Sequence, residues 1–242
     1  MTGEAYIVAT IRRWNIAAYW ETIRQLPGRW HLVTTPQELT LEAIAAIGPR
    51  YIFFPHWSHK VPKTILESHE CVCFHETDLP YGRGGSPLQN LIARGHQETV
   101  ISALRMTEEF DAGPIYAKRA LSLLGLGEEI FVRSARIVAE MIADIIERRP
   151  EPVPQSGEPT VFARRKPEQS RIAIDSDPSG PKPGMSSLER LFDHLRMLDA
   201  DGYPPAFLDY GPYRLEFTRP ALRAGSIAAD VKITLRPPEI ST

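Results

Sequence analysis

Three features that mark other classes of protein are scarce or absent in this sequence. It has only two cysteines, Cys71 and Cys73, which are separated by a single residue on a candidate strand. A disulfide between them would be strained. No apolar run reaches the length of about 18 residues that a membrane-spanning helix needs, and the first residues lack the basic and apolar regions of a signal peptide. We therefore expect a cytoplasmic protein in a reducing compartment, with no membrane partner.

An excess of charge of one sign is also missing. The chain has 28 Lys and Arg against 30 Asp and Glu, with no long run of either sign. A broad basic surface for RNA or DNA is therefore not expected, and neither is a nucleic-acid partner. With 242 residues, of which 43% are hydrophobic, the chain is long enough for one large globular domain with an appendage.

Short β-rich runs alternate with helical patterns through the first half of the chain. This alternation predicts an α/β fold, with a Rossmann-like, mostly parallel sheet and helices on both faces. The candidate strands are 6–10, 30–34, 50–55, 71–75, 99–106 and 114–122, and the candidate helices are 16–25, 40–47, 62–67, 86–94 and 128–148.

The composition changes after residue 150. Eight prolines between Pro150 and Gly184 predict a connector rather than a packed core element. A helix at 187–198 and alternating segments near 213–217 and 227–235 predict a small C-terminal β-containing appendage. The segment Tyr203–Phe207 looks exposed and could form a homodimer contact. The expected organisation is a catalytic domain (1–150), a connector (151–184) and the appendage (185–242).

Two polar residues stand where parallel strands of such a sheet place ligands. His75 ends a candidate strand and precedes a loop rich in glycine and proline. Ligands bind at the carboxyl ends of strands in open α/β sheets, and a histidine there can act as a general acid or base. The plainer alternative is a histidine that only caps the loop. Asp111 follows a later candidate strand. Without further evidence, an aspartate at such a position is interpreted as a turn residue.

The two residues lie in segments that match known signatures. The segment Cys73–Pro87, CFHETDLPYGRGGSP, resembles the formyltransferase signature Asn-x-His-x-Ser-Leu-Leu-Pro-x-x-Arg-Gly-x-x-Pro. Asp111–Ile115, DAGPI, lies 36 residues beyond His75 and resembles the second signature. Residues 164–168 and 198–207 resemble the connector that formyltransferases acting on tRNA and on sugars have in common. The chain thus resembles the N10-formyltetrahydrofolate-dependent formyltransferases.

This resemblance implies a role for each of the two polar residues. His75 would be the general acid/base, and Asp111 would orient and tune it. Formyl transfer passes through a tetrahedral oxyanion, which a histidinium at the strand end can stabilise or protonate.

Cys73 departs from the signature, which has asparagine at this position. A thiol cannot supply the amide donor expected to hold the oxyanion. The candidate substitutes are Gln89, Asn90 and the backbone N–H groups of Gly84 and Gly85. A nucleophilic pair of Cys73 and His75 is a competing interpretation, although the apolar run around Cys73 favours an inert packing thiol.

The resemblance also implies a folate site. N10-formyltetrahydrofolate is the expected cofactor and formyl donor, bound by the segment after the third strand, by the turn before Asp111, and by Gly85. The seven histidines show no metal-ligand spacing, so no metal is expected. The implied folate-binding positions are Ser58, His59, Lys60, Val61, Gly85, Thr107, Glu108, Glu109 and Phe110.

The acceptor is predicted from the segment after the first strand, which lacks the GxGxxG of a dinucleotide site. Arg12, Arg13 and Asn15 could hold a diphosphate while Trp14 stacks on a base, or the arginines could be a solvated pair. Arg83 is a further anion-binding candidate. We predict N-formyl transfer to a nucleotide-linked amino-sugar in glycan biosynthesis.

Two alternatives to this function remain open at the level of the sequence. The acceptor could be hydroxyornithine, glycinamide ribonucleotide or methionyl-tRNA. Because of Cys73, the protein could also be a catalytically impaired protein that binds folate or a nucleotide.

Overall fold

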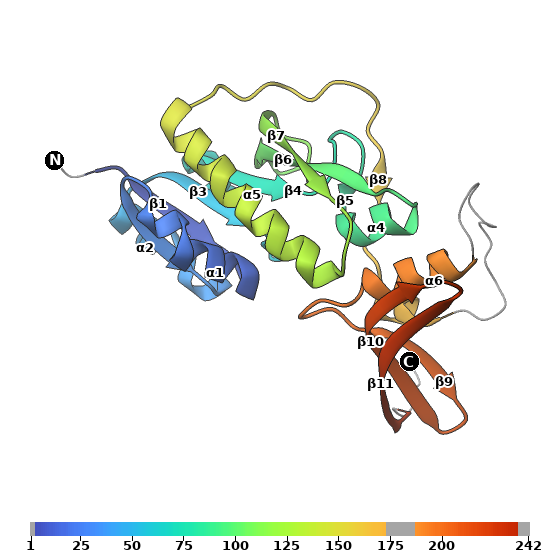
Figure 1. Ribbon diagram of the computed structural model, residues 1–242. Helices are drawn as coiled ribbons and strands as arrows, with labels where there is room; N and C mark the ends of the chain where they lie inside the picture. Colours follow the sequence, from blue (N-terminus) through green and yellow to red (C-terminus); the bar gives the residue numbers. More distant parts are fainter. Residues whose placement is uncertain (1–2, 173–186, 237–242) are drawn as a thin grey trace. The chain divides into compact units, whose positions relative to one another are not determined.

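The computed structural model describes residues 3–172 and 187–236 (Figure 1). They form two compact units. The first unit contains the described residues up to 87, together with 98–122 and 131–162. The second contains 88–97, 123–130 and the described residues from 163 onward. Two pieces of the range 1–150, predicted as one catalytic domain, thus belong to the second unit.

A six-stranded sheet forms the centre of the first unit. Its strand order is β2-β1-β3-β4-β6-β7. The pairs among β2, β1, β3 and β4 are parallel, whereas β6 is antiparallel to both β4 and β7. The predicted mostly parallel sheet is therefore confirmed. Its strands are β1 (Ala5–Ala9), β2 (Arg29–Val33), β3 (Pro49–Pro55), β4 (Cys71–His75), β6 (Glu98–Arg105) and β7 (Ile115–Ser122).

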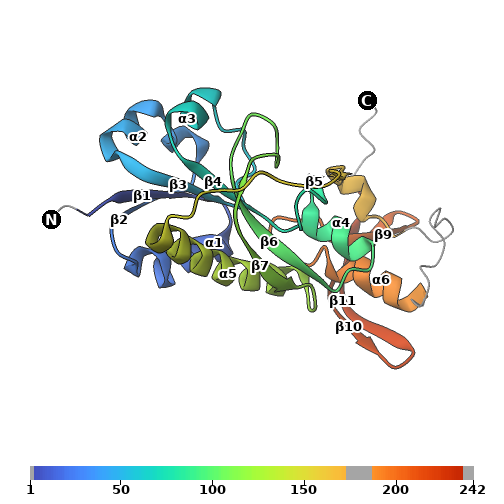
Figure 2. The same ribbon diagram turned by 90° about the horizontal axis from the view of Figure 1, so that it is seen from above.

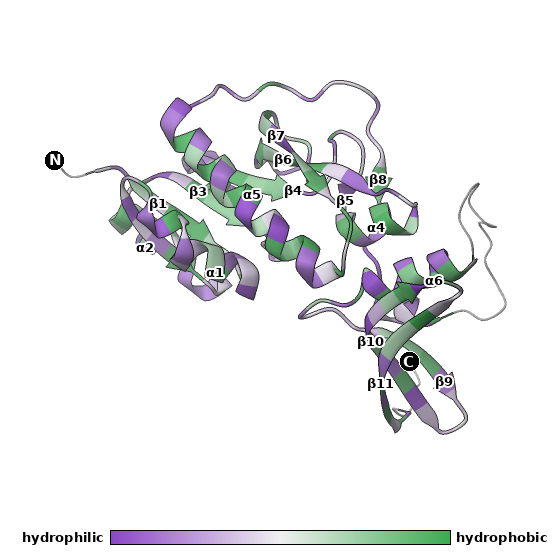
Figure 3. Ribbon diagram, in the orientation of Figure 1, coloured by the Kyte–Doolittle hydropathy of each residue, from purple (hydrophilic) through white to green (hydrophobic). Residues whose placement is uncertain are grey.

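Helices cover both faces of this sheet, as predicted. Figure 2 shows α1 (Arg13–Glu21) and α5 (Gly127–Arg148) on one side and α2 (Leu41–Ile47) and α3 (Lys63–Ser68) on the other. In Figure 3 the central strands are mostly hydrophobic, while α5 alternates between hydrophobic and hydrophilic positions along its length. This alternation is expected of an amphipathic helix that packs one stripe on a sheet.

Helix α2 shows how the sequence sets element ends. The Thr40 hydroxyl accepts a hydrogen bond from the Ala43 N–H at 3.2 Å and caps the first turn. Gly48 ends the helix with a φ of +61°, a left-handed conformation that glycine adopts without steric cost.

The core of the sheet follows the alternation of side chains along the strands. On one face, Ile7, Ile52 and Cys71 pack with Ile44 of α2 and Ile65 of α3. The aromatic rings of Tyr6, Tyr51, Phe53 and Phe74 pack on the opposite face. Burial of these apolar side chains is the main stabilising contribution to the unit. Both cysteines are free thiols, as predicted.

The prediction of an unpacked connector over 151–184 is wrong for its first part. Strand β8 (Val161–Phe162) pairs in parallel with β5 (Arg83–Gly84), and Phe162 is fully buried. A 3-10 helix follows at Pro167–Ser170. Proline removes backbone donors but leaves carbonyl acceptors, so a proline-rich segment can still be bonded and packed. Residues 173–184 of the predicted connector lie outside the described residues.

The second unit holds an antiparallel sheet in the order β11-β10-β9 and the helix α6 (Ser187–Arg196). Helix α4 (Pro87–Ala93) lies almost wholly in this unit. The strands are β9 (Ala206–Tyr210), β10 (Tyr213–Arg223) and β11 (Ser226–Leu235). Apart from these helices and strands, the described residues contain two further short 3-10 helices, Ile23–Gln25 and Pro36–Glu38.

The predicted appendage is confirmed for β10 and β11, but β9 was not predicted. The segment Tyr203–Phe207 was expected to be exposed, whereas Ala206 is fully buried and Phe207 pairs with Glu216 in the sheet. The two prolines before it hide the strand signal. The homodimer stays a prediction. Within residues 3–172 and 187–236, no helix has the length and apolar character needed to cross a membrane.

Candidate active site

The two signature residues meet in the first unit. His75 is buried at the end of β4, and its Nδ1 lies 3.6 Å from Oδ1 of Asp111. The other carboxylate oxygen of Asp111 accepts a hydrogen bond from the Gly84 N–H at 2.9 Å. The turn between β6 and β7 and the loop after β4 therefore converge on the histidine.

The second nitrogen of the imidazole also has a partner. His75 Nε2 lies 2.8 Å from the carbonyl oxygen of Gly82, which in turn accepts a hydrogen bond from the Thr77 hydroxyl at 3.3 Å. A carbonyl oxygen only accepts, so Nε2 carries a proton in this arrangement. His75 can reach a reacting group only by exchanging one of its two partners.

Glycine is required at two positions of the loop that holds the pair. A Cβ at Gly82, where φ is +77°, would lie 2.7 Å from the ring of Phe162. A Cβ at Gly84, where φ is +100°, would lie 2.5 Å from the carbonyl oxygen of Phe162. Asp111 itself has a φ of +55°, an uncommon conformation that surrounding contacts must hold in place.

Gln155 is a functional candidate that the sequence did not reveal. Its Nε2 donates to the carbonyl oxygens of Asp111 at 2.7 Å and Gly113 at 2.8 Å. Its Oε1 accepts from Nη2 of Arg83 at 2.8 Å and from Nε of Arg83 at 3.1 Å. The residue lies outside the signature segments, in the proline-rich part of the chain, and no pattern there singled it out.

Arg83 was predicted as an anion-binding residue, and the structure gives it a different partner set. In addition to Gln155, its Nη1 lies 3.3 Å from Oε1 of Glu109, and its side chain is only 16% exposed. The guanidinium charge is therefore already balanced by a carboxylate. A substrate anion would have to displace Glu109 to reach it.

Cys73 lies on the same face of β4 as His75, because the two are separated by one residue. Burial raises the pKa of the Cys73 thiol well above its ordinary value, and the negative charge of Asp111 raises it further. The sulfur packs against the apolar cluster around Ile52. A protonated, packed thiol does not support the interpretation of Cys73 as a nucleophile.

The predicted substitutes for the missing amide donor are all engaged elsewhere. The N–H of Gly84 donates to Asp111, and that of Gly85 donates to the carbonyl oxygen of Phe162 at 3.1 Å. Gln89 and Asn90 belong to the second unit, where their amides donate to the carbonyl oxygens of Met197 at 3.3 Å and Ala163 at 3.0 Å. The replacement of the asparagine by one of these groups stays a prediction.

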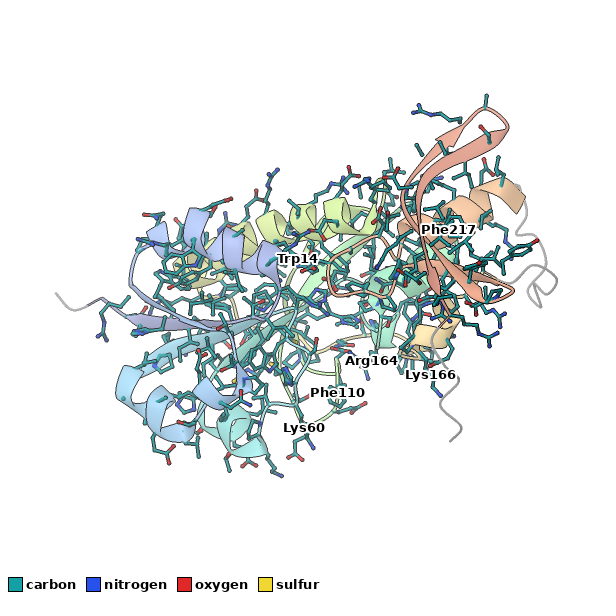
Figure 4. All side chains as sticks on the ribbon, turned by 90° about the horizontal axis from the view of Figure 1, so that it is seen from below. Trp14, Lys60, Phe110, Arg164, Lys166 and Phe217 are labelled. Atoms are coloured by element: carbon teal, nitrogen blue, oxygen red, sulfur yellow. The ribbon has the colours of Figure 1, made fainter. Side chains whose placement is uncertain are left out.

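The two segments implied for folate binding lie against each other. Lys63, which opens α3 after the first segment, forms an ion pair with Glu108 of the second, and Figure 4 shows Lys60 and Phe110 on the same side of the first unit. The ring of Phe110 is 71% exposed.

The remaining members of these two segments differ in burial and bonding. Ser58, His59 and Lys60 are exposed, whereas Val61 is buried in the core. In the second segment, the Thr107 hydroxyl donates to the carbonyl oxygen of Glu109 at 2.9 Å.

These segments fit a pterin in one further respect. The buried indole N–H of Trp57 has no hydrogen-bond partner among residues 3–172 and 187–236, and buried donors are normally satisfied. A polar aromatic ring that carries acceptor atoms would satisfy it. Within the described residues, no three metal-ligating side chains form a group that could hold a metal ion.

Of the four residues after β1 that were predicted to bind the acceptor, two are not available for that role. Trp14 is 5% exposed, and its ring stacks on that of Phe131, with 4.8 Å between the centroids. Asn15 is also buried, and its amide donates to the carbonyl oxygen of Pro55 at 3.5 Å. An aromatic residue at the start of α1 therefore contributes to the core. Arg12 is partly buried with its guanidinium 5.8 Å from the Trp14 ring, and Arg13 is exposed.

A second pair of titratable residues lies beside the first. Oε1 of Glu76 lies 3.8 Å from Nδ1 of His56, and the carboxyl group hydrogen-bonds to Ser134. Burial raises the pKa of Glu76, and the charge of Asp111 adds to the shift, whereas His75 and the Ser134 hydrogen bond oppose it. Glu76 was not singled out by the sequence, because the signature leaves the position after the histidine unspecified.

The raised pKa predicts how Glu76 affects stability. Between its ordinary pKa and the raised value, the folded state binds more protons than the unfolded state, so stability falls as pH rises. Glu76→Gln removes this titration. The free energy of unfolding is measured in urea from acidic to neutral pH. As the pH rises, the value for the variant should therefore increase relative to the value for the wild type.

The matched control for this prediction is Glu140→Gln, because Glu140 is an exposed glutamate on α5. It should follow the wild-type curve. A Glu76→Gln curve that runs parallel to the wild type would contradict the prediction.

Comparison with known proteins adds to this geometry. The family model described as the methionyl-tRNA formyltransferase C-terminal domain matches residues 167–234. The curated methionyl-tRNA formyltransferase of Thermus thermophilus is 29% identical over 146 residues, or 56% of this chain and 47% of that protein. The chain therefore spans about half the length of the curated relatives it matches.

Solved structures cover more of the chain. A sugar N-formyltransferase from a Shewanella species is 12% identical, with a TM-score of 0.64 over 91% of this chain and 99% of that one, and shares the fold. A structure from Clostridium thermocellum, described as methionyl-tRNA formyltransferase, is 46% identical over 96% of this chain and all of that one, with a TM-score of 0.89. Identity at this level over 96% of the chain shows that the protein belongs to the formyltransferase family, as the two signatures predicted.

Proposed function

We propose that the protein transfers a formyl group from N10-formyltetrahydrofolate to a primary amine. The observation that carries this proposal is the pair of His75 and Asp111, 3.6 Å apart, in a loop arrangement that glycine and Gln155 hold together. The donor supplies the formyl carbon. The folate segments 58–61 and 107–110, joined by the ion pair of Lys63 and Glu108, would bind it beside the pair.

His75 has the properties that proton transfer needs. Its ring carries a proton on Nε2 and faces a carboxylate with Nδ1. A carboxylate in this position holds the ring in one orientation and favours a second proton on Nδ1 when negative charge develops on the substrate. The amine must lose a proton and N10 must gain one, so a residue that passes a proton between them meets the requirement of the reaction.

A nucleotide-linked amino-sugar is the proposed acceptor. The described residues of the second unit hold 12 Lys and Arg and 10 Asp and Glu, so the unit has only a small excess of positive charge for a polyanion. The likeness in fold to a sugar N-formyltransferase over nearly its whole length agrees with this acceptor. Several of the cations are also paired within the unit: Arg196 with Asp193, Arg214 with Asp209, Arg219 with Asp230, and Lys232 with Glu216.

Methionyl-tRNA is the second candidate acceptor. It is favoured by the match of residues 167–234 to the C-terminal domain model and by the description of the Clostridium thermocellum relative. The two acceptors differ in the surface they need, since tRNA binding depends on many phosphate contacts and weakens steeply with salt.

One experiment tests the donor and the acceptor together. The non-reactive analogue 5-formyltetrahydrofolate is titrated against the protein, and turnover of N10-formyltetrahydrofolate is then measured with nucleotide-linked amino-sugars, methionyl-tRNA, hydroxyornithine and glycinamide ribonucleotide. We expect folate binding and formylation of an amino-sugar. If methionyl-tRNA alone were formylated, it would be the acceptor in place of the amino-sugar. Absence of folate binding would refute the proposed function.

A further inference from the structure

The segment that follows α5 contacts both loops of the candidate active site. We call residues 153–162 the strap. At its start, Val153 exchanges two backbone hydrogen bonds, of 2.8 and 2.9 Å, with Ile115, just after the turn that carries Asp111. At its end, β8 pairs with β5, and the Thr160 carbonyl accepts from the Arg83 N–H at 2.9 Å. The strap thus links two loops that are far apart in the sequence.

Within the strap, the side chain of Gln155 makes hydrogen bonds to both loops. Its amide makes two donor bonds, to the carbonyl oxygens of Asp111 and Gly113, and accepts two bonds from the Arg83 guanidinium. An amide has two N–H groups and an oxygen with two lone pairs, so these four bonds use its full capacity. They also fix its orientation, because a flipped amide would set N–H groups against the guanidinium and oxygen against two carbonyls.

The four bonds are placed on both sides of the reacting pair. The two carbonyls belong to Asp111 itself and to the residue two positions later. Arg83 stands between Gly82, whose carbonyl holds Nε2 of His75, and Gly84, whose N–H holds the carboxylate of Asp111. Gln155 therefore fixes the backbone that carries each partner.

We propose that Gln155 is a positioning residue that sets the distance and orientation of Asp111 relative to His75. The inference rests on the proposed function, in which this pair moves the proton during formyl transfer. Gln155 does not itself need to touch the substrate.

The sharpest test is Gln155→Glu, which keeps the shape of the side chain but cannot donate to the two carbonyls. The reaction measured is the hydrolysis of N10-formyltetrahydrofolate, which needs no other acceptor. Water oxygen bonds to the formyl carbon, the bond from that carbon to N10 breaks, formate is released, and a proton of the water goes to N10. We expect kcat to fall about 100-fold with KM nearly unchanged, because a small misplacement of a catalytic group has an effect of this order.

Two further variants serve as controls. One removes the hydrogen bonds without adding a charge, and the other makes the same Gln-to-Glu change away from the site. Gln155→Met fills the same space without any hydrogen bond and should lower kcat to a similar extent. Gln37→Glu makes the matched change at an exposed glutamine of the first unit and should leave kcat unchanged. Circular dichroism at the assay temperature checks that each variant is folded.

The NMR spectrum of the His75 imidazole nitrogens distinguishes failure of this inference from failure of the proposed function. If Gln155 positions Asp111, both Gln155→Glu and Gln155→Met shift the His75 signals and their pH titration, even if the wild type hydrolyses no folate. Wild-type turnover in both variants would overturn the inference. Lost turnover with unchanged His75 signals would overturn it too, because the residue would then act by another route.

Discussion

Turnover of N10-formyltetrahydrofolate is expected to fall by about 100- to 10,000-fold when His75 is replaced by alanine, the range that a positioned general acid or base contributes. The imidazole is buried, with Nε2 2.8 Å from the carbonyl oxygen of Gly82 and Nδ1 3.6 Å from the carboxylate of Asp111. Alanine removes the group that can pass a proton and leaves the Asp111 carboxylate without its partner. The implied folate segments do not include His75, so binding of 5-formyltetrahydrofolate should change little.

The measurement combines steady-state turnover with a binding titration of the same protein samples. His31→Ala is the matched control, since His31 lies on β2 opposite Ile7 in the first unit. It should retain wild-type turnover. If His75→Ala bound the folate normally and also turned it over at the wild-type rate, the histidine would have no part in the chemistry.

The second large expected effect is an increase in turnover. Cys73→Asn should raise turnover by about 100-fold, because one amide donor aimed at a developing oxyanion contributes 100- to 1,000-fold. The four donors that sequence analysis offered as substitutes are bonded elsewhere. The thiol at position 73 is a much weaker hydrogen-bond donor than an amide N–H.

The variant Cys73→Ala distinguishes the loss of the thiol from the gain of an amide donor. If the thiol only packs, this variant keeps the wild-type turnover while Cys73→Asn gains. Lower turnover in both folded variants would instead show that the thiol belongs to a working arrangement, and the expectation of a gain would be wrong.

The sheet could be predicted from the sequence because each strand is a short apolar run bounded by turn residues. Cys71–His75, for example, was expected over the same five residues that form β4. Strand β9 could not be predicted, since Pro204 and Pro205 immediately precede it and the segment reads as an irregular exposed stretch. Its burial depends on pairing with β10, a contact that local sequence does not record.

The candidate site also contains residues that the sequence reveals and residues that only the folded chain reveals. His75 and Asp111 were found because each lies in a recognisable signature, although 36 residues separate them. Gln155 lies 44 residues beyond Asp111 and 72 beyond Arg83, and only the folded chain brings the three together. Trp14 was misinterpreted for a related reason. An aromatic residue after a strand suits either a ligand or a helix packed above, and the ring of Phe131 occupies its face.

The strap also limits where the chain can be cut. The ribosome makes both His75 and Asp111 long before residues 153–162, so a growing chain holds the reacting pair before it holds the amide and the strand that support it. A fragment ending at residue 150, where composition suggested a boundary, would keep both reacting side chains without Gln155 or the β8 pairing. A fragment that keeps both Gln155 and the β8 pairing must extend at least through Phe162.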